Sequence, residues 1–299
     1  MLKKRYYAVL FVVLFLLVVS SPAQAAQKNA IVLAAFGSSE PEAVQSIKKF
    51  AENLRAEHED LKIVTAFTSR QLVESLKDTG NEIPSFTSAV ASLVDEGYLN
   101  IGVLPLFIMP GGQYAGLVQS AKGLESILSG KVRITVSPPL VGSEQDAFGL
   151  ASYLIYSLPS EIKPGEAVIF AGRGGEGAGS LVYPALNWGL FLQGEKGSLY
   201  MVVNVDNRES VSQTMNILKM NKRKVVWLVP LLTVHGKRSA ELFGTDDNSF
   251  ASRLKDAGHT VRTHKQGLVV NASVQSMWKA RLKRLIADME AVNRQGLSS

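Results

Sequence analysis

The chain has 299 residues, with 32 Lys and Arg, 26 Asp and Glu, four His and no Cys. A content of 46% hydrophobic and 19% charged residues excludes a disordered chain, and the length suits one large domain or two medium-sized ones. The absence of Cys excludes disulfides, iron–sulfur clusters, thiolate zinc sites and cysteine nucleophiles.

The first 25 residues have the layout of a secretory signal peptide. Residues 3–5 are basic, residues 8–19 form an unbroken apolar run, and Ala23 and Ala25 are small residues at −3 and −1 of a cleavage site. The apolar run is shorter than the roughly 20 residues of a membrane anchor, which is the rival interpretation. We therefore expect cleavage after residue 25 or 26 and an exported, periplasmic protein with no membrane span. Cleavage leaves 29 basic and 26 acidic residues, a net charge of +3 that gives no argument for a nucleic-acid partner.

The first half of the remaining chain alternates buried strands with amphipathic helices. Continuous apolar runs predict strands that are buried on both faces. Ser39 and Glu42 form a capping-box pattern, with Pro41 between them, and predict a helix that begins there. The predicted strands are residues 30–36, 62–67 and 100–107, with a helix over about 85–96 before the last.

The second half repeats this order, with strands predicted at residues 167–171, 198–205 and 224–232. The segments 103–106 and 228–231 share a proline near the end of the third strand, which suggests a duplication, although α/β halves resemble one another in general. We predict two similar lobes, residues 26–160 and 161–299. Ligands of open α/β sheets bind beyond the carboxyl ends of the strands, so a cleft between the lobes is expected.

A glycine-rich segment follows the first strand of the second lobe. Residues 172–177 satisfy the pattern G-x-G-x-x-G, but the glycines continue to Gly179, and a helix beginning near Pro184 is favoured. A dinucleotide loop opens directly into its helix and is followed about 20 residues later by an acid that this chain lacks at that spacing. The segment therefore predicts a loop at a strand end rather than a nucleotide site.

Only one of the four histidines lies where a cleft residue is expected. His58 is part of a charged helix end, and His259 and His264 flank a short edge-like segment. His235 comes just after the third strand of the second half. A neutral imidazole there is able to bind a metal or move a proton, and the alternative is a loop histidine bonded to the backbone.

Several segments together resemble one known family. They are residues 34–39 (AAFGSS), 66–70 (AFTSR), 96–114, 183–188 (YPALNW) and 226–236 (VWLVPLLTVHG). In order and spacing they resemble the anaerobic sirohydrochlorin cobaltochelatases of cobalamin biosynthesis, a branch of the class II chelatases. The resemblance covers nearly all of the chain after the leader. It implies an α/β fold of two similar lobes, each with a parallel sheet flanked by helices, around a tetrapyrrole cleft.

The resemblance also assigns roles to residues of the second lobe. Arg173 and Arg238 stand where the family has histidines, and Asp206 stands where it has an acidic residue. Arginine has no lone pair to offer a metal and repels a dication, but it binds carboxylates in a bidentate manner. The two arginines are therefore expected to anchor the carboxylates of a tetrapyrrole, while Asp206 and His235 are expected to handle metal and protons.

These expectations give a first function and two rivals. The first is a chelatase that inserts Co²⁺ or another divalent metal, as a substrate and not as a bound cofactor, into a tetrapyrrole. The second is a periplasmic tetrapyrrole- or haem-binding protein without catalysis, and the third is a solute-binding protein for another small anion. Whether the protein is a homo-oligomer is left open. The first-lobe residues expected to face the cleft are Gly37, Ser38, Phe67, Thr68 and Ser69.

Overall fold

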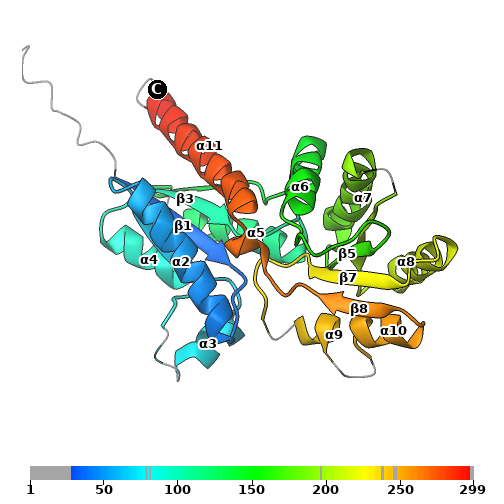
Figure 1. The fold of residues 1–299 in the computed structure, drawn as a ribbon. Coiled ribbons are helices and arrows are strands. Elements are labelled where there is room, and N and C mark those ends of the chain that lie inside the picture. Colours follow the sequence, from blue (N-terminus) through cyan, green and yellow to red (C-terminus); the bar gives the residue numbers. More distant parts are fainter. Residues whose placement is uncertain are drawn as a thin grey trace, which may run out of the picture.

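A computed structural model of the protein describes residues 28–77, 80, 82–128, 130–195, 197–236, 239–244 and 248–296 (Figure 1). The leader expected at residues 1–25 lies outside the described residues. Within the described part, no helix is long and apolar enough to cross a membrane.

The first lobe is built on a parallel sheet with the strand order β2-β1-β3-β4. The three strands predicted for this half are confirmed within two residues at each end. The short edge strand β4 was not predicted. The elements are β1 (Asn29–Ala35), α2 (Pro41–Glu57), β2 (Lys62–Phe67), α3 (Arg70–Lys77), α4 (Phe86–Asp95), β3 (Asn100–Pro105), α5 (Gly112–Ile127) and β4 (Arg133–Val136).

The second lobe has a parallel sheet of the same design, with the order β6-β5-β7-β8. Each sheet places its first strand between its second and third strands, so the two similar lobes are confirmed. The elements are β5 (Ala167–Gly172), the 3₁₀ helix η1 (Gly177–Leu181), α7 (Val182–Gln193), β6 (Leu199–Asn204), α8 (Arg208–Met220), β7 (Val225–Pro230), α9 (Ala240–Phe243), α10 (Phe250–Asp256), β8 (Thr260–Thr263) and the 3₁₀ helix η3 (Leu268–Val270).

The helix starts differ in how well they follow the sequence pattern. Helix α4 begins as predicted, because the Ser85 hydroxyl accepts a hydrogen bond from the Ser88 amide at 3.2 Å. The capping box predicted from Ser39 is wrong. Helix α2 has Glu40 as its N-cap without a side-chain cap, since the Ser38 hydroxyl binds the Glu40 amide at 3.1 Å and places the helix start one residue later.

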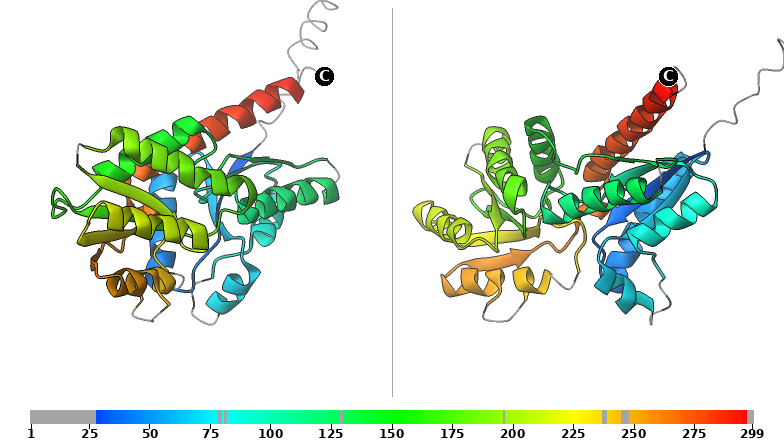
Figure 2. Two further views of the ribbon diagram at one scale, coloured as in Figure 1. Left: turned by 90° about the vertical axis from the view of Figure 1, so that its right-hand side faces the viewer. Right: turned by 180° about the vertical axis from the view of Figure 1, so that it is seen from behind.

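The two lobes exchange helices. Helix α6 (Glu144–Tyr156) precedes the predicted boundary but packs on α7, where Gly189 allows the close approach of Ala151. Helix α11 (Ala272–Gly296) ends the chain but packs on β3, where Gly102 leaves room for Met289. Figure 2 shows the result, with α11 (red) on the side of the first lobe and α6 and α7 (green) over the second. The division at residue 160 thus separates the strands of the two sheets. Helices α6 and α11, however, each pack on the lobe that lies on the other side of this division in the sequence.

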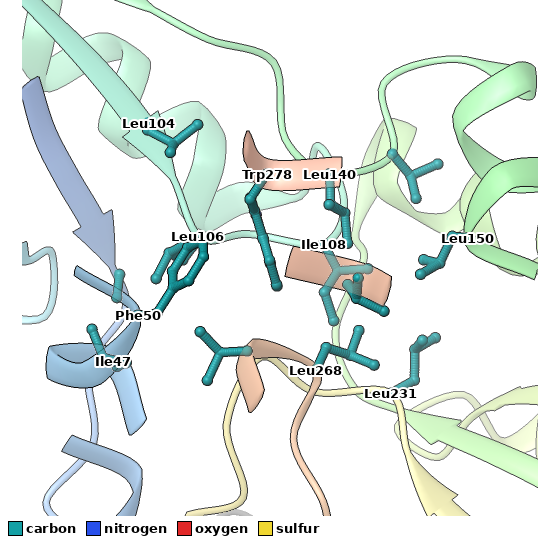
Figure 3. Packing of buried hydrophobic residues seen from close by; sticks show 14 of the residues in the cluster. Ile47, Phe50, Leu104, Leu106, Ile108, Leu140, Leu150, Leu231, Leu268 and Trp278 are labelled. Atoms are coloured by element: carbon teal, nitrogen blue, oxygen red, sulfur yellow. The ribbon is translucent and has the colours of Figure 1, made fainter. Parts of the chain in front are cut away.

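One hydrophobic cluster joins the lobes (Figure 3). At its centre Trp278 is fully buried, with its ring 5.9 Å from that of Phe50. Leu106 of the first lobe and Leu231 of the second belong to the same cluster. A hydrogen bond of 2.8 Å from the Thr233 hydroxyl to the Leu106 carbonyl also crosses between the lobes. A shared, close-packed core fixes how the two sheet edges face each other.

Candidate functional site

A cavity of about 1040 Å³ lies at the carboxyl ends of both sheets. Its walls include the segments that follow six strands, which is the position expected for a ligand site in this fold class. The volume is at the upper end for small-molecule sites. The segments are residues 36–39 after β1, Ser69 after β2, 106–109 after β3, 173–176 after β5, Asp206 after β6 and 231–234 after β7.

The structure places the predicted first-lobe residues in different surroundings. Gly37, Ser38 and Ser69 line the cavity. Thr68 lines a neighbouring cavity of about 1050 Å³ on the first lobe. Phe67 is fully buried, and its ring packs so closely on Gly37 that a Cβ at residue 37 would lie 2.6 Å from it. Phe67 therefore supports the cavity wall from behind, in place of the expected contact with a ligand.

Arg173 and Asp206 form a hydrogen-bonded ion pair in the cavity wall. The Oδ1 atom of Asp206 accepts hydrogen bonds from Arg173 Nε at 3.0 Å and Nη2 at 2.8 Å. Its Oδ2 atom accepts one from the Gly174 amide at 2.9 Å. The Asn204 amide group in turn donates to the Gly174 carbonyl at 2.8 Å. The ends of β5 and β6 are thus tied together through both oxygens of one carboxylate.

This pairing bears on both roles expected from the sequence. Arg173 binds the carboxylate of Asp206 of the same chain, and its role as an anchor for a tetrapyrrole carboxylate stays a prediction. A metal would have to displace this guanidinium, because both carboxylate oxygens already accept charge-assisted or backbone hydrogen bonds. Among the described residues, no group of three or more His, Asp or Glu is arranged to hold a metal. Arg238, the second expected anchor, lies outside the described residues.

His235 lies beside the cavity, and its neighbours Val234 and Gly236 line the wall. Its ring packs 5.6 Å from that of Phe243. The Nδ1 atom is buried and has no hydrogen-bond partner in the described part of the chain. Burial, with the positive charge of Lys265, lowers the pKa of the imidazole. A neutral ring is suited to accept a proton, but His235 itself does not line the cavity, and the shared metal role of His235 and Asp206 stays a prediction.

This lowered pKa predicts a pH-dependent stability. The unfolded chain protonates His235 near pH 6.5, whereas the folded protein does so only at lower pH. The contribution of the neutral His235 ring to the unfolding free energy is therefore complete above about pH 6.5. It is lost as the pH falls from there through the folded pKa of His235. We expect His235→Gln to flatten the unfolding free energy between about pH 7.5 and 5.5 in urea titrations. The control His264→Gln, at a half-buried histidine that bonds Gln266, should keep the wild-type slope, and an unchanged slope in His235→Gln would contradict the prediction.

Two long helices begin at the cavity without a side-chain cap. Helix α2 follows Ser38 and Ser39, and α5 has Gly111 as its N-cap. At α5 the uncapped amides and the helix dipole favour negative charge, whereas at α2 the carboxylates of Glu40 and Glu42 already occupy the helix start. Sequence reasoning missed the contribution of Gly111 and Gln113, although the Pro-Gly-Gly signal directly after the third strand marks this loop.

Comparison with known proteins decides the family. A family model described as "Cobalt chelatase (CbiK)" matches residues 29–287. The chain belongs to this family. The resemblance found in the sequence segments is thereby confirmed, and with it the class of fold.

Two relatives and two solved structures illustrate the similarity. Sirohydrochlorin cobaltochelatase CbiKC of Nitratidesulfovibrio vulgaris is 30% identical over 232 residues, which cover 77% of this chain and 81% of the relative. The sirohydrochlorin cobaltochelatase of Salmonella typhimurium is 25% identical over 262 residues, covering 87% and 97%. SirB from Bacillus subtilis with Fe³⁺ has a TM-score of 0.63 at 16% identity, covering 88% and 98%. SirB from Bacillus subtilis subspecies spizizenii in complex with cobalt has a TM-score of 0.61 at 14% identity, covering 88% and 97%. The two structures show the shared fold.

Proposed function

We propose that the protein is a metal chelatase of tetrapyrrole biosynthesis that inserts Co²⁺, or another divalent metal, into sirohydrochlorin or a related tetrapyrrole. The observation that carries this proposal is membership of the cobalt chelatase family over residues 29–287. The cavity between the lobes supports it, because a large site with the uncapped N-terminus of α5 in its wall suits a ligand with carboxylates. In this proposal the metal ion is a substrate and no cofactor is held permanently.

The contacts of Arg173 suggest how a site without the family histidines works. A carboxylate of the incoming tetrapyrrole competes with Asp206 for the guanidinium, because both are planar carboxylates that suit bidentate binding. Exchange of one carboxylate for the other leaves the charge of Arg173 balanced and releases Asp206. The Oδ1 atom of Asp206, whose Oδ2 atom still accepts from the Gly174 amide, then attracts the divalent metal, and the neutral His235 accepts a pyrrole proton.

The same ion pair favours a second candidate, a tetrapyrrole carrier without catalysis. If Asp206 stays bound to Arg173 when the ligand arrives, no described group in the cavity wall replaces the family's metal ligands. The site would then bind an anionic pigment through the N-terminus of α5 and perform no reaction.

One assay separates the two candidates. Purified protein is mixed with sirohydrochlorin and Co²⁺, and the absorption spectrum is followed against the non-enzymatic rate. Acceleration that is lost in Asp206→Ala and His235→Ala supports the chelatase. Pigment binding without acceleration supports the carrier, and an absence of pigment binding contradicts both.

We also propose that the protein acts outside the cytoplasm, on the strength of the signal-like pattern in residues 1–25. Expression of the full chain followed by fractionation and intact mass measurement tests this. A periplasmic product that begins at residue 26 or 27 is expected, and an uncleaved cytoplasmic product would contradict it.

A further inference from the structure

Helix α7 carries large apolar side chains on its outer side. Trp188 and Phe191 are 52% and 72% exposed, and their rings stack at 5.5 Å with an angle of 20° between the planes. Leu181, the N-cap of α7, and Leu192 in its last turn are 70% and 56% exposed. These four residues are called the α7 patch below. Stacked aromatic rings in solvent are unusual, because water-exposed apolar surface is costly.

The sequence around the patch has no charge. Residues 177–194 contain no Lys, Arg, Asp or Glu. The inner side of α7 is buried as well, through Tyr183, Leu186 and Leu190, against α6 and β6. A helix that faces solvent normally carries charged residues on its outer side, whereas a helix that is apolar all round is typical of one covered on both sides. Figure 1 shows α6 and α7 side by side above the second sheet.

The size of the patch suits the centre of a dimer interface. With about 150–250 Å² of surface for each large side chain, the exposed fractions amount to roughly 375–625 Å² per copy. Two copies together would bury on the order of 1,000 Å², the lower limit for a specific interface before any surrounding contacts are added. Trp is among the residue types that contribute most to binding at such centres, and interface cores are depleted of charge.

We propose that the α7 patch binds the α7 patch of a second copy of this chain in a two-fold symmetric dimer. A two-fold axis places the same residues against each other, so an uncharged apolar surface meets an equal one and no charge is desolvated. A membrane surface is the less suitable occupant, because helices that lie on membranes carry Lys and Arg near their apolar face, and residues 177–194 have none. This inference does not depend on the proposed chelatase function.

The first test measures the molar mass in solution. Light scattering and sedimentation should give a dimer for the wild-type protein and a monomer for Trp188→Glu, with the dissociation constant raised at least about 100-fold. Met220→Glu is the matched control, because Met220 is 80% exposed on α8, outside the patch, and its variant should stay dimeric. A monomeric wild-type protein, or a dimer that persists in Trp188→Glu, overturns the proposal.

A second test uses the absence of Cys and does not introduce a charge. Because the chain has none, a single introduced thiol is the only target of a short bis-maleimide crosslinker. A symmetric interface brings each patch residue near its own copy, so at least one of Leu181→Cys, Trp188→Cys and Phe191→Cys should give a covalent dimer. Met220→Cys should give no covalent dimer under the same conditions. No crosslink in any patch variant, or equal crosslinking of Met220→Cys, overturns the proposal even if Trp188→Glu fails to fold.

Discussion

Arg173→His is expected to raise the rate of Co²⁺ insertion by about 100-fold over the wild-type protein. Two effects combine at this position. Loss of the guanidinium removes the two hydrogen bonds that Arg173 donates to Asp206, so no substrate carboxylate has to displace this guanidinium before the metal reaches Oδ1. The imidazole adds a neutral nitrogen that is able to bind Co²⁺ or accept a proton, and a positioned acid–base group contributes roughly 10²–10⁴-fold. Initial rates with sirohydrochlorin and Co²⁺, followed by absorption, measure the gain.

Two further variants show which effect matters. Arg173→Gln removes the positive charge beside Asp206 without supplying an imidazole, so it should reach only part of the gain. Asp206→Asn placed in the Arg173→His protein should abolish the gain, because an amide retains little attraction for a dication. If Arg173→His is slower than the wild-type protein, the prediction is wrong, and the hold of the guanidinium on a substrate carboxylate contributes more to the rate than an added metal ligand.

The ion pair illustrates what the sequence made predictable and what it did not. The resemblance placed Arg173 and Asp206 in one site, and the parallel pairing of Gly172 with Asn204 explains why they meet just beyond two neighbouring strand ends. Their direct contact was not predicted, because the pattern of residues does not say which carboxylate a guanidinium will select. The strand order, with β6 next to β5, is the feature that brings the two residues within contact of each other.

The fold was predictable where the apolar pattern is long. Strands buried on both faces appear as continuous runs, and these were located within about two residues. Strand β4 was missed because it has four residues at the sheet edge, of which Ile134 alone is buried. The exchange of α6 and α11 was also hidden, since helical periodicity shows that a face is covered but not by which lobe.

Gly175→Ala is expected to be far more damaging than Gly174→Ala in the same loop. Both glycines have a positive φ, +85° and +73°, so either substitution adds roughly 1–2 kcal/mol of backbone strain. Only at residue 175 is the space filled. A Cβ there would lie 2.7 Å from Met109 Sδ, 3.0 Å from the Tyr183 ring and 3.1 Å from the Gly179 carbonyl oxygen. At residue 174 nothing lies within 4 Å of a Cβ.

This difference makes the pair of variants a test of whether the loop holds the site in place. The overlap adds roughly 1–3 kcal/mol, so the total cost for Gly175→Ala is about 2–5 kcal/mol in urea unfolding. The Met109 side chain belongs to the first lobe and lines the cavity, so the new methyl group pushes the loop away from that wall and moves Arg173 with it. Pigment binding should weaken at least about tenfold in Gly175→Ala and change little in Gly174→Ala. Equal loss in both variants would mean that strain at the strand end, and not contact between the lobes, sets the position of Arg173.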